Sequence, residues 1–272
     1  MRLSGLFIYP VKSLRGIRVV NAKVDTLGLV GDRRFLIVDE AGAPLTQRAL
    51  PRMAQVETAL TDSDLVLRAS GVSPCAIPRR TTGPSSPRTV SVWQSTNLIA
   101  DDCGDDPAKW LEAFLGVSCR LVRIGEQFRR PVLSARSDAH DIVTFADAFP
   151  FLVTSEASLS DFNDRLVAKG EEPIPMDRFR PNLVVSDCTP FEEDTWRSVQ
   201  IGELTFRAGG PCSRCIMTTT DQLTGERGKE PLRTLSTYRR DLTKPSDINF
   251  GQNLIHETKS GSIAVGDLVE PL

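Results

Sequence analysis

The sequence predicts a mainly β protein with a few helices, of the α+β class, built from two β-rich units. Three observations lead to this prediction. Short runs of β-branched and apolar residues alternate with turn residues over roughly the first 100 positions, without an intervening helix. Two segments with helical periodicity follow, and β-rich runs then continue to the end. This succession favours a sandwich or a barrel in the first unit, with a boundary near residues 120–140.

The first unit consists of predicted strands separated by turns and one long loop. Asp39 to Gly42 forms a tight turn, because glycine tolerates a positive φ at the last position. Residues 78–88 contain three prolines and no apolar period, which indicates a loop. The predicted strands cover residues 3–9, 18–26, 35–39, 55–60, 65–69 and 89–93.

Helix signals begin after residue 100. Asp106 is the predicted N-cap of a first helix, with Pro107 at its first position, and Gly116 ends it. A second helix begins at Ser155 and stops near Gly170. A short third helix is predicted at residues 231–240, and strands at residues 118–124, 182–185, 199–201, 204–207, 250–255 and 263–269.

Composition excludes several classes of protein. The 33 Lys and Arg residues balance 35 Asp and Glu residues, which argues against a broad nucleic-acid-binding surface. No apolar run reaches the ~18 residues that a membrane span needs, and the apolar stretch at the start is too short for a signal peptide. We therefore expect a cytoplasmic protein that binds neither a nucleic acid polymer nor a membrane. With only two histidines, a site built on imidazole is disfavoured.

The segment Gly209–Cys215 carries the most distinctive chemistry. Two glycines and a proline predict a sharply shaped loop, and a strand-like run, Ile216–Thr220, follows it. Arg214 beside the cysteines favours a thiolate, the form that binds metals or attacks electrophiles. Four interpretations of the two cysteines remain open. They are half of a zinc site, a dithiol redox pair, one cysteine bound to a soft metal, and two buried thiols that only fill space.

Three short basic segments offer groups for an anion or a flat heterocycle. Residues 9–13 place a cation and a hydroxyl just after the first strand, a combination that suits a phosphate. Residues 31–35 hold Arg33 and Arg34, which alternation sends to opposite faces, so only one of them can share that site. Residues 178–182 add arginines and an asparagine. Each segment alone is more typical of solvated surface, and their joint occurrence with the cysteine segment favours a site.

Together these segments resemble the MOSC family, named from the C-terminal domains of molybdenum cofactor sulfurases, and more closely its two-domain branch with the amidoxime reducing components. The resemblance covers nearly the whole chain. It implies a MOSC N-terminal β-barrel-like domain at residues 1–124, packed on a C-terminal MOSC β-barrel at residues 125–272. The stretches that carry it are residues 8–13, 150–159, 179–182, 212–215, 229–235 and 250–252.

The resemblance also implies a set of cofactor contacts. Cys215 matches the cysteine that binds molybdenum beside the dithiolene of molybdopterin, so it is the expected catalytic and metal-binding residue, with Cys212 structural or accessory. The expected cofactor-binding residues are Lys12, Ser13 and Arg33 for the phosphate, Arg180, Asn182, Ser213 and Arg214 for the pterin side, Asp147 at an acidic position, and Cys215 itself. Ala148, Phe149 and Asn253 depart from the residues of relatives, which bears on substrate preference.

By the same resemblance, we expect an oxidoreductase that reduces hydroxylamines or amidoximes, with molybdenum-molybdopterin (Moco) as its cofactor. The sequence has no dinucleotide fingerprint and no iron–sulfur cysteine series. Electrons would therefore come from a separate flavoprotein, ferredoxin-like protein or haem protein. The alternative is a carrier of the cofactor, or a sulfur-transfer module acting through a persulfide on Cys215. A third hypothesis is a metal-free protein with a redox-active Cys212/Cys215 pair.

Overall fold

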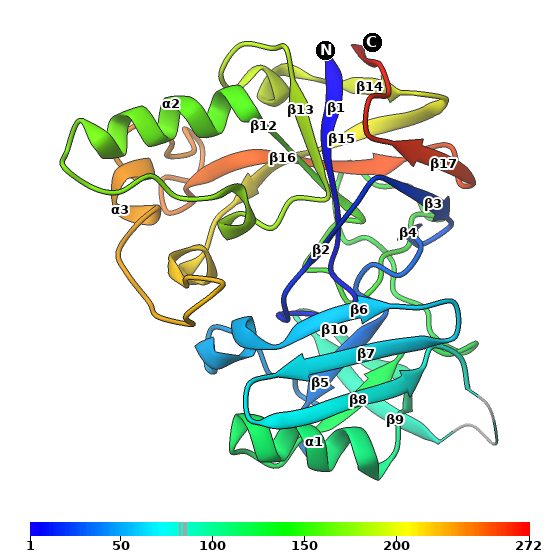
Figure 1. Cartoon of the computed structure of the whole chain (residues 1–272). Coiled ribbons are helices and arrows are strands. Elements are labelled where there is room, and N and C mark those ends of the chain that lie inside the picture. The colour runs from blue at the N-terminus through cyan, green and yellow to red at the C-terminus, as the bar shows by residue number, and fades with distance from the viewer. Residues whose placement is uncertain (82, 84–85) are drawn as a thin grey trace.

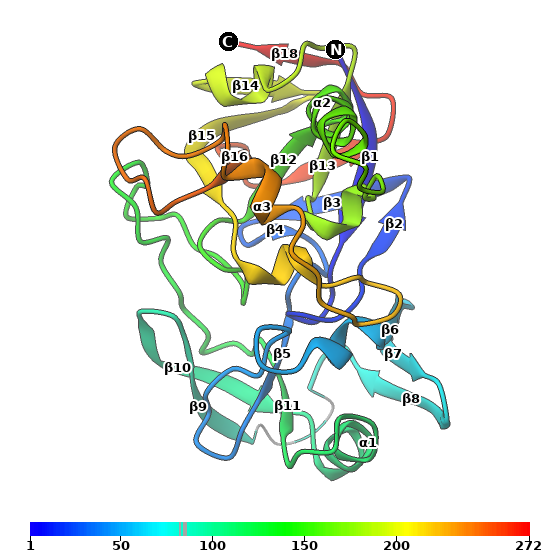
Figure 2. The ribbon, with the colours of Figure 1, turned by 90° about the vertical axis from the view of Figure 1, so that its left-hand side faces the viewer.

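The computed structural model describes residues 1–81, 83 and 86–272. Over these residues the chain is mostly β, which confirms the predicted fold class. Figure 1 shows two stacked parts: an upper part around one large sheet and a lower part with two smaller sheets. Figure 2, turned by 90°, shows the same two parts with both termini at the upper end. The termini lie close together, since the Val269 N–H donates to the Met1 carbonyl oxygen at 3.1 Å.

The large sheet takes strands from both ends of the chain. Its neighbouring strands are antiparallel except for β12 and β13, which run parallel. In sheet order the strands are β18 (Val269–Pro271), β14 (Ser198–Ile201), β15 (Leu204–Ser213), β16 (Asn249–His256), β12 (Phe151–Ser155), β13 (Leu183–Ser186), β1 (Arg2–Ile8) and β2 (Ile17–Val19).

A three-stranded sheet joins the beginning and the end of the chain again. Its order is β17 (Gly261–Ala264), β3 (Asn21–Asp25) and β4 (Gly28–Leu29). The predicted strand 18–26 is thus two strands, because β2 pairs with β1 while β3 pairs with β17. The predicted strand 263–269 is also two, because the chain turns between them, where the Asp267 N–H donates to the Ala264 carbonyl oxygen at 3.1 Å. The predicted domain boundary after residue 124 stays a prediction; strands from both sides of it share these sheets.

The lower part consists of two further sheets and a helix. One sheet has the order β6 (Glu57–Leu60), β7 (Asp64–Ala69), β8 (Val72–Pro78), and the other β5 (Phe35–Val38), β11 (Arg120–Arg123), β10 (Ser95–Asp102), β9 (Pro87–Val92). Strands β8 and β10 were not predicted, because prolines in one and polar residues in the other hide the apolar alternation. Of the predicted loop 78–88, residues 82, 84 and 85 lie outside the described residues.

Helix α1 (Asp105–Leu115) packs its buried residues, among them Leu111 and Phe114, into the core of the lower part. It begins with Gly104 as N-cap, so the predicted N-cap Asp106 is wrong. The φ of Gly104 is 95°, a left-handed value that favours glycine there. Because the N-cap is Gly104, Asp105 and Asp106 lie inside the first turn of the helix. The helix ends as predicted at Gly116, whose φ is 75°.

Helix α2 (Glu156–Val167) covers one face of the large sheet, as Figure 1 shows. It begins as predicted after Ser155, whose hydroxyl accepts a hydrogen bond from the Ser158 N–H at 3.0 Å. Helix α3 (Leu232–Leu235) is a single turn, shorter than the predicted 231–240, because the chain continues in turns. No described helix combines the length and the apolar character needed to cross a membrane.

Candidate functional site

Three strand ends of the large sheet converge on one place. Strand β1 is antiparallel to β13, so the end of β1 lies beside the start of β13, with Leu6 opposite Leu183. Strand β12 is parallel to β13, so its start lies there too. Asn182 joins the three: its Nδ2 donates to the Phe7 carbonyl oxygen at 3.2 Å, and its Oδ1 accepts from the Leu152 N–H at 3.3 Å. Segments far apart in sequence therefore meet at this edge of the sheet.

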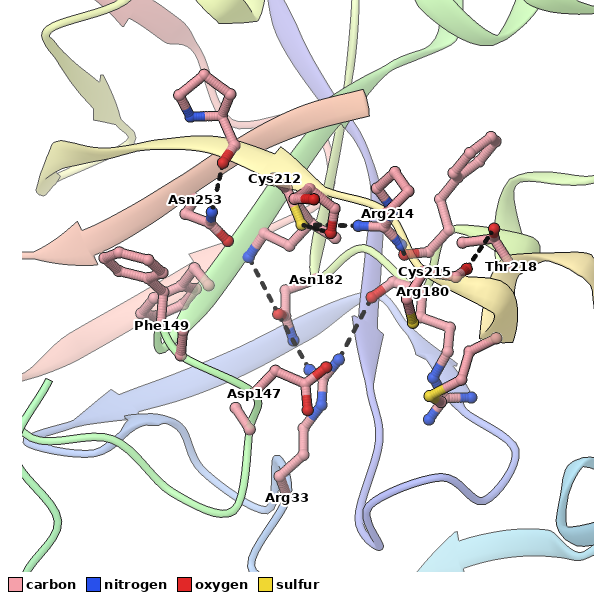
Figure 3. A pocket seen from close by; sticks show the side chains of 18 of the residues that line it. Arg33, Asp147, Phe149, Arg180, Asn182, Cys212, Arg214, Cys215, Thr218 and Asn253 are labelled. Atoms are coloured by element: carbon pink, nitrogen blue, oxygen red, sulfur yellow. Dashed lines mark hydrogen bonds between the residues drawn. The ribbon is translucent and has the colours of Figure 1, made fainter. Parts of the chain in front are cut away.

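A pocket of about 530 Å³ lies at this edge. All nine predicted cofactor-binding residues line it, and Figure 3 shows several of them from close by. These nine residues are Lys12, Ser13, Arg33, Asp147, Arg180, Asn182, Ser213, Arg214 and Cys215. Neither histidine is among the lining residues, and His256 is buried with its Nε2 at 2.8 Å from the Asp25 carbonyl oxygen. A zinc site with Cys212, Cys215 and a histidine is therefore not assembled here.

Two arginines enclose the ring of Tyr9. The guanidinium carbons of Arg33 and Arg180 each lie 4.3 Å from the centre of that ring. Arg33 is held by Asp32, at 2.7 Å, and reaches Asn182 Oδ1 at 3.1 Å. Burial lowers the pKa of Arg180 to about 10, so the side chain remains a cation at neutral pH. Of the two adjacent arginines, Arg33 lines the pocket, while Arg34 binds Asp25 and does not line it.

The residues after β1 form a corner of the pocket that contains a lysine and a serine. Lys12 Nζ donates to the Phe145 carbonyl oxygen at 2.9 Å and forms an ion pair with Asp147. Burial lowers the pKa of Lys12, against the opposing effect of Asp147. Loss of water raises the pKa of Asp147, but Lys12 and Arg48 outweigh that effect and hold it below its usual value. Ser13 is buried, and its hydroxyl oxygen has no hydrogen-bond partner among residues 1–81, 83 and 86–272.

The cysteine segment differs from its predicted conformation. Residues 209–213, predicted as a loop, belong to β15, because β16 supplies hydrogen-bond partners across two irregularities in register. A Cβ at Gly209 would lie 2.5 Å from Phe149 Cε1, so a larger residue there would displace that ring. Cys215 then precedes a 3₁₀ turn, η4 (Ile216–Thr219), so the predicted strand-like run is wrong. The turn closes on Cys215, whose carbonyl oxygen accepts from the Thr218 N–H at 3.0 Å.

The two sulfur atoms have different arginine partners. Arg214 Nη1 lies 2.8 Å from Cys212 Sγ, and its Nη2 donates to the Phe179 carbonyl oxygen at 2.6 Å. Burial raises the pKa of the Cys212 thiol, although Arg214 opposes this. Arg48 Nη2 lies 3.4 Å from Cys215 Sγ. The guanidinium that donates to the Cys215 sulfur therefore belongs to Arg48 and not, as expected, to Arg214.

Sequence reasoning missed two residues that approach this site from the lower part. Arg48 lies in the loop after β5, where no local pattern marks it. Trp93 lies in the turn between β9 and β10, and its Nε1 donates to Asp147 Oδ1 at 3.1 Å. Arg48 contacts the same carboxylate at 3.6 Å. The predicted strand 89–93 included Trp93, whereas β9 ends at Val92 and Trp93 lies in the turn.

Charge and unpaired groups indicate the kind of ligand that fits. Six cationic side chains and two carboxylates line the pocket, so its net charge is positive. The Ser13 hydroxyl and Arg214 Nε are buried without hydrogen-bond partners among the described residues. The Cys215 sulfur, partly exposed, adds a soft ligand to these groups. The arrangement therefore suits a ligand that carries an anionic group and also a soft atom, such as a metal, that the Cys215 sulfur can bind.

Comparisons with known proteins agree with this chemistry. Residues 1–118 match the MOSC N-terminal beta barrel domain, and residues 140–270 match the MOSC domain. Mitochondrial amidoxime-reducing component 1 of Mus musculus is 37% identical over 281 residues, which cover 97% of this chain and 80% of that protein. Mitochondrial amidoxime reducing component 2 of Bos taurus is 35% identical over 283 residues, 98% of this chain and 82% of that protein.

A third relative is larger. Molybdenum cofactor sulfurase of Anopheles gambiae is 37% identical over 254 residues, which cover 86% of this chain and 32% of that protein. The matches confirm the resemblance, the cofactor and the enzyme class expected from the sequence. The chain belongs to the MOSC family, is similar over nearly its whole length to the amidoxime-reducing components, and is an enzyme that depends on the molybdenum cofactor.

Proposed function

We propose that the protein reduces N-hydroxylated compounds, such as hydroxylamines and amidoximes, with electrons from a separate flavoprotein, ferredoxin-like protein or haem protein. In the overall reaction the N–O bond breaks, two electrons and two protons are consumed, and the oxygen leaves as water. The names of the relatives support this substrate class. The observation that carries the proposal is the convergence of Cys215 with the basic groups of three distant segments in one pocket. We also propose the cytoplasm as its compartment and residue 124 as the end of its first domain.

The described residues fit the molybdenum cofactor. Cys215 is proposed as the protein ligand of the metal, and when bound the metal supplies the two-electron chemistry that removes oxygen from nitrogen. The free Ser13 hydroxyl, with Lys12 and Arg33, is proposed to bind the phosphate by charge-assisted hydrogen bonds. On the pterin side the proposed contacts are Arg180, Asn182, Ser213 and Arg214, with Asp147 at the acidic position.

The contacts within the pocket give these residues fixed directions. Arg33 bridges Asp32 and Asn182, and its Nη2 also donates to the Arg180 carbonyl oxygen at 3.3 Å. Arg180 Nη1 donates to Gln222 Oε1 at 3.2 Å. Because these guanidinium groups are already oriented, binding an anion orders few side chains, which favours affinity. The protein thus contributes orientation and positive charge, while Asp147 keeps Lys12 paired.

The test is a serine substitution at the proposed ligand. In protein expressed in a host that makes the cofactor, Cys215→Ser is expected to lower bound molybdenum and benzamidoxime reduction with a chemical reductant at least about 100-fold, because a direct ligand is lost. Elemental analysis measures the metal, and benzamidine formation measures the activity. Cys75→Ser, in β8 away from the pocket, is the matched control and is expected to change neither. A Cys215→Ser protein with normal metal content and turnover would refute the proposed ligand.

A second candidate function rests on the match to the sulfurase. A cofactor carrier or sulfur-transfer module would use the same pocket without reducing a substrate. The two functions separate in one experiment: the loaded protein is mixed with an apo-molybdoenzyme, and metal transfer is measured beside benzamidoxime reduction. Transfer with no reduction, in protein that contains molybdenum, supports the carrier function. Reduction without stoichiometric transfer supports the reductase.

A further inference from the structure

Trp93 occupies an unusual position in the turn of a β-hairpin. Val92 pairs with Ser95, which leaves Trp93 and Gln94 as the two-residue turn between β9 and β10. The φ of Trp93 is 54°, a left-handed value for which such turns use Asn, Asp or Gly. The backbone of a residue with a bulky side chain is strained at this φ, and residues with such backbone strain are often found at functional sites. The residue is also 58% exposed, so burial in a core does not account for it.

The contacts of this tryptophan direct it toward the pocket. Its indole N–H donates to Asp147 Oδ1 at 3.1 Å, and Asp147 lines the pocket. The guanidinium carbon of Arg48 lies 4.5 Å from the centre of the indole ring. Arg48 also reaches Cys215 Sγ at 3.4 Å. Trp93 and Arg48 do not themselves line the pocket, but these contacts place the indole beside Asp147, at the edge of the pocket, and one arginine away from the sulfur.

Only part of the indole surface is used by these contacts. Arg48 lies over the ring and the Asp147 carboxylate binds its edge, yet more than half of the residue stays exposed. An exposed aromatic surface held in one orientation binds flat conjugated rings by stacking. Phe149 is an aromatic side chain of the pocket lining itself.

We propose that Trp93, oriented by Arg48 and Asp147, is a substrate-binding platform that selects N-hydroxylated compounds whose N–OH group is attached to a flat conjugated system, such as aryl amidoximes and N-hydroxylated nucleobases. The proposal rests on the proposed reductase function and deepens it. Stacking on Trp93 binds the conjugated part of the substrate at the rim. The N–OH group then faces the pocket interior, where Cys215 lies.

The test compares two substrates with the same reacting group. Benzamidoxime has a ring and acetamidoxime has none. In Trp93→Asn, which keeps a residue that tolerates the turn, the KM for benzamidoxime is expected to rise about tenfold, with the KM for acetamidoxime within about twofold of wild type. Trp93→Phe retains a ring and is expected to give a smaller rise. Trp110→Phe, on α1 outside the pocket, is the control and is expected to leave both KM values unchanged.

A binding measurement without turnover separates this proposal from the reductase function. Equilibrium dialysis of the loaded, unreduced protein measures the Kd for benzamidoxime, and Trp93→Asn is expected to weaken it about tenfold. If wild-type protein binds benzamidoxime through Trp93 but does not reduce it, the reductase function fails and the platform stands. Equal effects of Trp93→Asn on both substrates, no effect on either, or no benzamidoxime binding by wild-type protein would each overturn the platform.

Discussion

Three of the seven described non-glycine residues with a positive φ line the pocket. Ser13, Arg33 and Arg180 have φ values of 68°, 45° and 54°, in the left-handed region that residues with a Cβ seldom adopt. Each such residue costs on the order of 1–3 kcal/mol, which surrounding contacts must offset. For Arg33 one such contact is its backbone N–H, which donates to the Tyr9 carbonyl oxygen at 2.7 Å. Polar groups of the pocket are therefore held in place before any ligand binds.

A buried carboxylate outside the pocket gives a pH-dependent prediction. Asp141 accepts hydrogen bonds from the Asp138 N–H at 2.8 Å and from Lys259 Nζ at 2.9 Å, and it pairs with Arg207. Burial raises the pKa of Asp141, but these three partners outweigh that effect and lower it to about 2. Because the folded-state pKa lies below the usual Asp value, the carboxylate stabilises the fold above about pH 4, and this contribution is lost as the pH falls through 2.

Asp141→Asn is therefore expected to lower the free energy of unfolding by about 2 kcal/mol at pH 7, and the difference from wild type should narrow below pH 4. Urea unfolding at a series of pH values measures it. Asp138→Asn is the matched control, because Asp138 contacts the same Arg207 but its side chain is 73% exposed; its effect should stay under about 0.5 kcal/mol. A pH-independent effect of Asp141→Asn would contradict the pKa assignment.

At the scale of elements, a short turn positions the proposed metal ligand. The 3₁₀ turn η4 follows Cys215 directly, and Arg178 holds it from outside. Arg178 Nε donates to the Thr218 carbonyl oxygen at 2.8 Å, and its Nη2 donates to the Glu230 carbonyl oxygen at 3.1 Å. The first bond satisfies a carbonyl group that a single turn leaves unpaired, and the second ties the same arginine to the segment just before α3.

Helix α2 depends on its N-cap. Ser155 is fully buried, and its hydroxyl accepts from the Ser158 N–H, so Ser155→Ala is expected to reduce the free energy of unfolding by about 1 kcal/mol. Denaturant titration followed by circular dichroism measures this change. Ser160→Ala, on an exposed position of the same helix, should be nearly neutral. Equal effects of the two substitutions would show that the cap contributes nothing specific.

At the scale of the whole molecule, the first part of the chain completes the core of the second. Strand β1 pairs with β13, and β3 pairs with β17. Apolar side chains from both ends of the chain therefore share one core. Its members from the first 30 residues are Leu3, Leu6, Ile8, Ala22, Val24 and Leu29.

This shared core predicts that residues 125–272 do not fold alone. Without β1 to β4, strand β13 loses a neighbour and the apolar face of the large sheet is exposed, so the fragment is expected to aggregate or to stay unfolded. Circular dichroism and limited proteolysis of the purified fragment test this. Co-expression with residues 1–124 should restore a protease-resistant complex. A fragment that unfolds cooperatively near the melting temperature of the full chain would contradict the prediction.

Local patterns in the sequence were sufficient for many elements. The start of α2 at Ser155 and the end of α1 at Gly116 follow from caps, which depend on a few neighbouring residues. The cysteine pair and the basic segments could also be recognised, because each is defined by a few neighbouring residues. Strands β8 and β10 were missed because prolines in β8 and polar residues in β10 hide the apolar alternation, while pairing with neighbouring strands stabilises both.

The sequence by itself determined the β-rich class, the family and the residue types of the pocket, because these depend on short-range patterns and motifs. Only the tertiary structure decided which groups touch: Lys12 pairs with Asp147, 135 positions away, and Arg48 reaches Cys215, 167 positions away. Such contacts follow from the antiparallel return of β1 beside β13 and from the stacking of two β-rich parts. No local sequence pattern encodes these long-range contacts. The residues around each partner would fit the same local structure in many other arrangements of the chain.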